Sequence, residues 1–108
     1  MKGESADNGI PRADPGLAQR VKSGARVGLR GVASSDPDGD PLHYEWTQVR
    51  GAKVDLVGSN DAIASFVAPR VSAARLLRFR LRVTDMTGPD TIKGADSLPA
   101  YVDIWVDP

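Results

Sequence analysis

A strict two-residue alternation in residues 77–84 constrains the fold of this chain more than any other feature. The apolar side chains of that run are Leu77, Phe79, Leu81 and Val83, and they alternate with Arg78, Arg80, Arg82 and Thr84. Successive side chains of a strand point to opposite faces, whereas a helix would spread these four apolar groups around its circumference. The segment is therefore predicted to be a strand with one face in the core and the other toward solvent.

Other short runs show the same period and predict an all-β domain. Apolar residues alternate with polar ones in 26–32, 42–47 and 101–107, and less regularly in 62–67. A short strand is expected at Val54 and Leu56, a helical turn at 71–76, and a long connection from Met86 to Pro99. Glycine, proline and asparagine punctuate these runs, and 12 of the 14 acidic residues are Asp, which favours turns over helices. Six or seven short strands predict a sandwich or a small barrel.

Composition excludes several function classes. The chain has no Cys, so disulfides, thiolate nucleophiles and Cys-based zinc sites are excluded. Its formal net charge is zero, which gives no general attraction to nucleic acid or to an acidic membrane. No apolar run approaches the roughly 20 residues of a membrane span, so direct membrane insertion is not expected. Residues 1–7 lack the apolar core of a signal peptide and are expected to be a disordered linker or a cloning remnant, which leaves 8–108 as one domain.

An acidic turn precedes the aromatic strand at residues 42–47. Residues 34–41 read Ser-Ser-Asp-Pro-Asp-Gly-Asp-Pro and place Asp36, Asp38 and Asp40 in one tight turn. The strand that follows sends Leu42, Tyr44 and Trp46 to a single face. Trp46 is therefore predicted to be a core residue.

These motifs resemble those of the PKD-type domain, in its bacterial branch related to the KIAA-type adhesion receptors. The resemblance rests on 8–16, Ser35–Asp40 with the Tyr44-x-Trp46 strand, 64–69 and 79–85. One departure is Thr47-Gln48-Val49-Arg50-Gly51, where many PKD domains carry Gly-Asp-Gly. The resemblance implies an immunoglobulin-like β-sandwich of about seven strands. It also implies a module of a longer exported chain, which would be extracellular, at the cell surface or periplasmic.

On that immunoglobulin-like frame, oxygen-bearing side chains of three segments are expected to meet at one end of the sandwich. They are Asn8, Asp36, Asp38, Asp40 and Asp85. Calcium prefers six to eight oxygen ligands from flexible, acidic loops, and the resemblance implies Ca²⁺ at matching positions of some PKD-like domains. The alternative is a purely structural role, since Asp and Asn stabilise turns through their own side chains. The sequence leaves both interpretations open.

The outward face of the predicted sheet carries a second candidate site. The candidate binding residues are Arg78, Arg80, Arg82, Tyr101 and Trp105, with His43, Glu45 and Asp103 on the same face. Exposed aromatic and Arg side chains are typical of interfaces and would suit a polysaccharide or a cell-surface protein. The alternative is a solvated polar face held by Arg–carboxylate pairs and by Arg–aromatic contacts.

No catalytic arrangement is visible. His43 is the only histidine and lies on outward parity, and the chain has no Gly-x-Ser-x-Gly, Gly-rich phosphate loop or His-Glu-x-x-His motif. The sequence therefore predicts a non-catalytic module that spaces, stiffens or docks neighbouring domains of the same chain. The alternatives are a carbohydrate- or protein-binding adhesion module and an accessory domain of a secreted hydrolase.

Overall fold

The computed structural model describes residues 10–37, 39–88 and 91–108, and these form an all-β domain. The strands are β1 (Gln19–Lys22), β2 (Arg26–Arg30), β3 (Leu42–Arg50), β4 (Ile63–Val67), β5 (Arg75–Gly88), β6 (Thr91–Asp96) and β7 (Ala100–Asp107). Within the described ranges no helix has the length and apolar character needed to cross a membrane.

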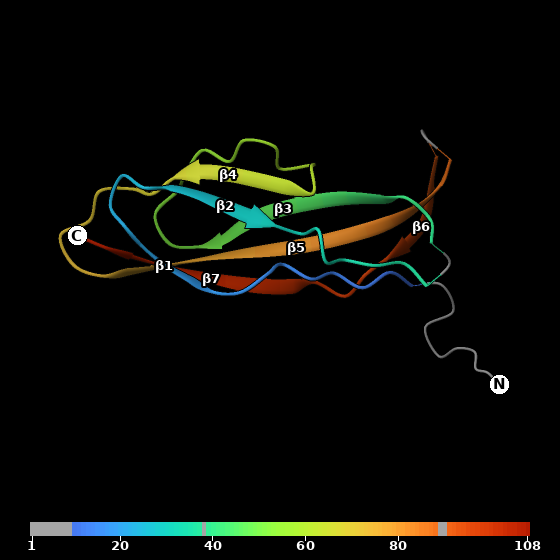
Figure 1. Ribbon diagram of the computed structural model, residues 1–108, viewed down its shortest axis with the longest axis horizontal. Helices are drawn as coiled ribbons and strands as arrows, with labels where there is room; N and C mark the ends of the chain where they lie inside the picture. The colour runs from blue at the N-terminus through green and yellow to red at the C-terminus, as the bar shows by residue number, and fades with distance from the viewer. Residues whose placement is uncertain (1–9, 38, 89–90) are drawn as a thin grey trace.

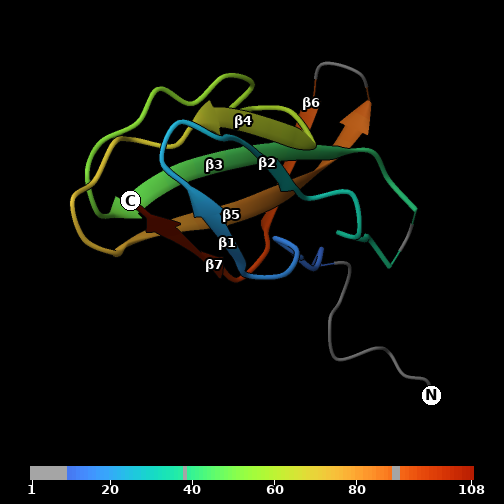
Figure 2. The same cartoon turned by 60° about the vertical axis from the view of Figure 1, so that its left-hand side comes forward.

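Two sheets make up the sandwich (Figures 1 and 2). The larger has the order β1-β7-β5-β3, with β6 beside the far end of β5, and the smaller pairs β2 with β4. All pairings are antiparallel except that of β1 with β7, which is parallel. The long central strand β5 therefore contacts β3 along one edge and, along the other, first β7 and then β6.

The core lies between the sheets and follows the predicted alternation. In β5 the inward residues Leu77, Phe79, Leu81 and Val83 are completely buried. Phe66 of β4 and Phe79 of β5 meet across the layers with ring centroids 4.9 Å apart. Trp46 of β3 is only 3% exposed, and its Nε1–H donates to the carbonyl of Asp61 at 3.0 Å. These contacts confirm the inward parity of both strands and the core role of Trp46.

Three local predictions were wrong. Residues 54–56 form no strand, and only Val57 makes an isolated bridge, with Ser65. Residues 71–76 contain a bend and then the start of β5, not a helical turn. The connection expected from Met86 to Pro99 is largely a hairpin, because β5 continues to Gly88 and returns as β6.

Gly51 and Gln48 explain why the chain after β3 does not continue as a strand. Gly51 has a φ of 96°, and a Cβ there would lie 2.5 Å from the carbonyl oxygen of Leu76. The Gln48 side chain then bonds the loop: its amide donates to the carbonyl of Ala52, and its oxygen accepts from the N–H of Val54. The Gln48 side chain thus bonds backbone groups of Ala52 and Val54, which would bond a neighbouring strand if this segment were itself a strand.

Candidate functional site

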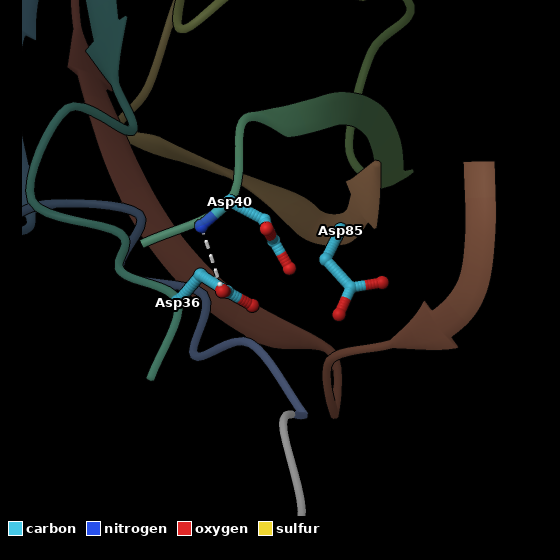
Figure 3. A group of neighbouring side chains, drawn as sticks. All are labelled: Asp36, Asp40 and Asp85. Atoms are coloured by element: carbon cyan, nitrogen blue, oxygen red, sulfur yellow. Dashed lines mark hydrogen bonds between the residues drawn. The ribbon is translucent and has the colours of Figure 1, made fainter. Parts of the chain in front are cut away.

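The acidic turn and the far part of β5 form a carboxylate cluster at one end of the sandwich (Figure 3). Asp36 and Asp40 come from the turn before β3, and Asp85 comes from β5. One carboxylate oxygen from each residue lies within 4.8 Å of the corresponding oxygens of the other two. The structure therefore brings together three of the five predicted ligands. The other two, Asn8 and Asp38, lie outside the described residues.

Asp36 shapes the turn that presents the cluster. Its Oδ2 accepts from the N–H of Asp40 at 2.9 Å, and its carbonyl accepts from the N–H of Gly39 at 3.0 Å. Gly39 has a φ of 74°, which a glycine adopts without a steric penalty. Asp36 therefore has the structural role expected of an Asp in a turn, and it also faces the cluster.

The strand register places Asp85 beneath that turn. Asp85 pairs with Leu42, the first residue of β3, and points to the inner side of the sheet, where it is 1% exposed. The N–H of Met86 donates to the carbonyl of Pro41 at 3.0 Å, which attaches the end of the turn to β5. Asp85 is thus a buried carboxylate at the base of an acidic loop.

The geometry fits a shared divalent cation. Calcium holds oxygen ligands at about 2.4 Å, so two ligands of one ion can be at most about 4.8 Å apart, and the three carboxylates meet this limit. At an effective dielectric near 20, two unit negative charges at that separation repel by roughly 3.5 kcal/mol. Positive charge or donated hydrogen bonds near the three carboxylates would reduce this repulsion.

The same end of the sandwich holds the entering chain. Arg12 and Ser35 form an isolated bridge, with N···O distances of 2.8 and 3.0 Å, and the N–H of Asp14 donates to Ser34 Oγ at 2.9 Å. The segment that follows residue 10 is therefore hydrogen-bonded to the part of the β2–β3 connection just before Asp36. A conformational change in the acidic turn would therefore affect this segment through the bridge between Arg12 and Ser35.

The second candidate site, the outer face of the larger sheet, carries internal ion pairs. Arg78 Nε lies 2.6 Å from Asp103 Oδ1, and Arg78 Nη2 lies 3.1 Å from Asp103 Oδ2, as the cross-strand register allows. The hydrogen bonds from Arg78 hold the pKa of Asp103 below its usual range, although partial burial opposes them. The Arg–carboxylate pair considered in the sequence is confirmed here.

Trp105 contacts an arginine that the sequence did not single out. The guanidinium of Arg20, on β1, lies 6.0 Å from the Trp105 ring centroid and binds both carboxylate oxygens of Asp107 at 2.8 Å. The predicted partners were the arginines of β5, but the register sets Leu76 opposite Trp105 on that strand. The parallel pairing of β1 with β7 sets Arg20 beside Trp105. The alternation in β1 covers only four residues, which is too short to predict that strand or its pairing from the sequence.

Comparisons with known proteins agree with the fold described above. A family model described as "K319L-like, PKD domain" matches residues 16–93. The solution structure of the PKD domain from KIAA 1837 protein is similar, with a TM-score of 0.69 and 22% identity over 99% of this chain and 91% of that one. No curated protein matches the chain at a significant level.

Two larger proteins contain a similar fold. A nucleoside hydrolase-related hypothetical protein from Saccharophagus degradans, associated with carbohydrate metabolism, matches 91% of this chain with a TM-score of 0.63 and 23% identity. A 2,6-sialyltransferase from Photobacterium matches 84% with a TM-score of 0.54 and 14% identity. The chain spans only 25% and 17% of these proteins, and at such identities the likeness concerns the fold alone.

Proposed function

The chain belongs to the family of K319L-like PKD domains, and on this premise we propose that it spaces and stiffens neighbouring domains of a larger exported protein. PKD domains are typically extracellular β-sandwich modules and are generally non-catalytic. The observation that carries the proposal is the placement of chain entry and exit at opposite ends of the sandwich.

Hydrogen bonds fix both ends of the domain. At the entry end, Arg12 and Ser35 exchange backbone bonds beside the acidic turn. At the other end, where Figure 1 shows the C-terminus, the carbonyl of Asp107 accepts from both the N–H and the hydroxyl of Ser23. Between them runs β5, whose 14 residues span about 45 Å. A module bonded at both ends of such a strand transmits orientation between its neighbours.

Calcium at the carboxylate cluster is the second part of the proposal. An ion held by Asp36, Asp40 and Asp85, together with Asn8 and Asp38, would neutralise the acidic turn. The bridge between Arg12 and Ser35 would then become more stable, because it starts one residue from Asp36. The cation would thereby stiffen the joint to a preceding domain.

Amide hydrogen exchange on the whole chain tests this proposal at single residues. The amides of Arg12 and Ser35 report on the entry end, and those of Gly24 and Ala68, which form the backbone bonds Gly24 N–Ala68 O and Ala68 N–Ala25 O, report on the opposite end. With millimolar Ca²⁺ replacing chelator, we expect protection of the first pair to rise about tenfold or more, while the second pair changes less.

Two results would reject the cation part. One is calorimetry without heat at millimolar Ca²⁺ together with an unchanged melting temperature in chelator. The other is an equal rise in protection at both ends, which would indicate global stabilisation instead of a stiffened joint. The spacing role needs a separate test, in which a second domain is fused to the N-terminus of this chain. That role would be rejected if the fused domain reoriented freely both in chelator and in millimolar Ca²⁺.

A second function is proposed for the outer face of the larger sheet, as a contact surface for carbohydrate or protein. Its support is the exposure of two aromatic side chains, Tyr101 at 53% and Trp105 at 40%, within a row of arginines. Aromatic and Arg side chains are enriched at binding hot spots. If Trp105→Ala leaves binding to glycan arrays and to neighbouring domains unchanged, this face is only solvated.

A further inference from the structure

We propose that the outer face of the larger sheet binds an anionic polysaccharide, meaning a sugar polymer that carries carboxylate or sulfate groups. This inference rests on the second function proposed above and narrows its ligand to one chemical class. It is carried by three observations: a local excess of positive charge, two arginines without an ion pair, and an exposed tyrosine beside a polar hollow.

The charge of the chain is distributed unevenly. The chain as a whole is neutral. Strand parity and register place six basic side chains on this face, against four acidic ones. The basic residues are Arg20, Lys22, Arg50, Arg78, Arg80 and Arg82, and the acidic residues are Glu45, Asp96, Asp103 and Asp107. The face therefore has a net positive charge, which attracts polyanions over a range set by ionic strength.

Arg80 and Arg82 supply the available positive charge. Arg20 and Arg78 are neutralised by Asp107 and Asp103 within the sheet. Throughout residues 10–37, 39–88 and 91–108, by contrast, no carboxylate oxygen forms an ion pair with Arg80 or Arg82. Both are partly exposed. Residues two apart in a strand lie about 6.7 Å apart, so these guanidinium groups form a short row along β5.

Tyr101 gives this face the features of a sugar site. It pairs with Arg80 across β7 and β5 and is 53% exposed. Beside it is a shallow hollow of about 310 Å³, lined by Arg78, Asp103 and the small residues Gly16 and Ala18. A phenol ring offers an apolar surface to the C–H groups of a sugar ring, and the Arg–Asp pair offers donors and acceptors to its hydroxyls.

The acidic residues on the face favour a polysaccharide over a nucleic acid. Single-stranded nucleic acid also binds to basic surfaces with aromatic platforms. A phosphodiester backbone, however, has no hydroxyl donor for the Asp103 carboxylate, which stays an acceptor beside Arg78, whereas the hydroxyls of a sugar ring can donate to it. PKD domains are also typically extracellular, a location that suits a polysaccharide better than a nucleic acid.

The test compares two polymers that share one sugar backbone, dextran sulfate and unsubstituted dextran. Binding to the whole chain is measured at several salt concentrations. We expect dextran sulfate to bind and dextran to bind at least tenfold more weakly. The double variant R80Q/R82Q should weaken binding to dextran sulfate at least tenfold and lower the slope of log affinity against log salt by about one to two.

A matched double variant controls for the loss of positive charge itself. R26Q/R30Q removes two exposed arginines from β2, in the other sheet, with the same change in net charge. It should leave the affinity within about twofold. Tyr101→Ala should weaken binding several-fold without altering the salt slope, because the ring carries no charge. Far-ultraviolet dichroism and melting temperatures establish that each variant is folded.

Three outcomes would overturn the proposal. Equal loss in both double variants would show nonspecific attraction to the whole chain. Tighter binding of single-stranded DNA than of dextran sulfate would assign the face to nucleic acid. Binding of a neutral glycan or a protein that depends on Trp105 but not on Arg80 and Arg82 would reject the anionic class, yet it would leave the proposed contact surface intact.

Discussion

The substitution Asp85→Asn distinguishes a cation site from a purely structural role for the carboxylate cluster. If the cluster binds calcium, the substitution should raise the melting temperature without calcium and lower it, relative to the native protein, with calcium. Asn has nearly the same shape as Asp but no charge. Asp85 lies within 4.8 Å of the carboxylates of Asp36 and Asp40. The repulsion removed is about 1 kcal/mol per pair in a water-like dielectric and roughly 3.5 kcal/mol at an effective dielectric of 20.

Without calcium, the variant should therefore be the more stable protein. A net gain of only about 1 kcal/mol raises the melting temperature of a domain this size by about 4 °C or more. With calcium, the order should reverse. Extracellular calcium modules have dissociation constants of about 10⁻⁴–10⁻³ M, so 10 mM Ca²⁺ would stabilise the native protein by about 1.4–2.7 kcal/mol. That corresponds to a rise of roughly 6 °C or more, and the variant should gain little of it.

Thermal unfolding in chelator and in 10 mM Ca²⁺, followed by near-ultraviolet dichroism, measures both effects. Asp55→Asn is the control, because it removes the same charge from an exposed residue outside the cluster. Its melting temperature should follow that of the native protein in both conditions. The reasoning is refuted if Asp85→Asn lowers the melting temperature equally with and without calcium, which would make Asp85 a structural residue alone.

Three further predictions concern stability. Phe79→Ala should cost about 3–5 kcal/mol in urea unfolding, because Phe79 is completely buried against Phe66; a loss below 1 kcal/mol would contradict the packing. Gly51→Ala should lower the free energy of unfolding by about 1–3 kcal/mol in the same assay, and by more than Gly24→Ala. Both glycines have positive φ, but a Cβ at Gly51 would contact backbone atoms within 4 Å, whereas a Cβ at Gly24 would contact nothing within that distance. The lowered pKa of Asp103 predicts a stabilisation that is complete above the ordinary value of 3.8 and is lost as the pH falls below it. The gap in melting temperature between the native protein and Asp103→Asn should therefore narrow as the pH falls from 7 to 2.5, and a gap that stays constant would refute the ion pair.

The strands of the core could be predicted from the sequence because their information is local. The alternation in β5 and β7 assigns each side chain to a face without knowledge of its partner strand, and the Asp-Pro-Asp-Gly-Asp turn fixes where β3 begins. Trp46, whose parity follows from that start, was placed in the core correctly. The errors arose where the chain has no clear period, as at 54–56 and 71–76.

Only the tertiary structure decided which side chains meet. The cluster forms because the β3–β5 register sets Asp85 opposite Leu42, and Arg20 reaches Trp105 because β1 pairs in parallel with β7. Registers of this kind depend on contacts between residues tens of positions apart, and local periodicity is unchanged when a strand shifts by two residues along its partner. The sequence by itself therefore determined which faces of the strands are apolar, acidic or basic. The strand registers decided which of those side chains lie together.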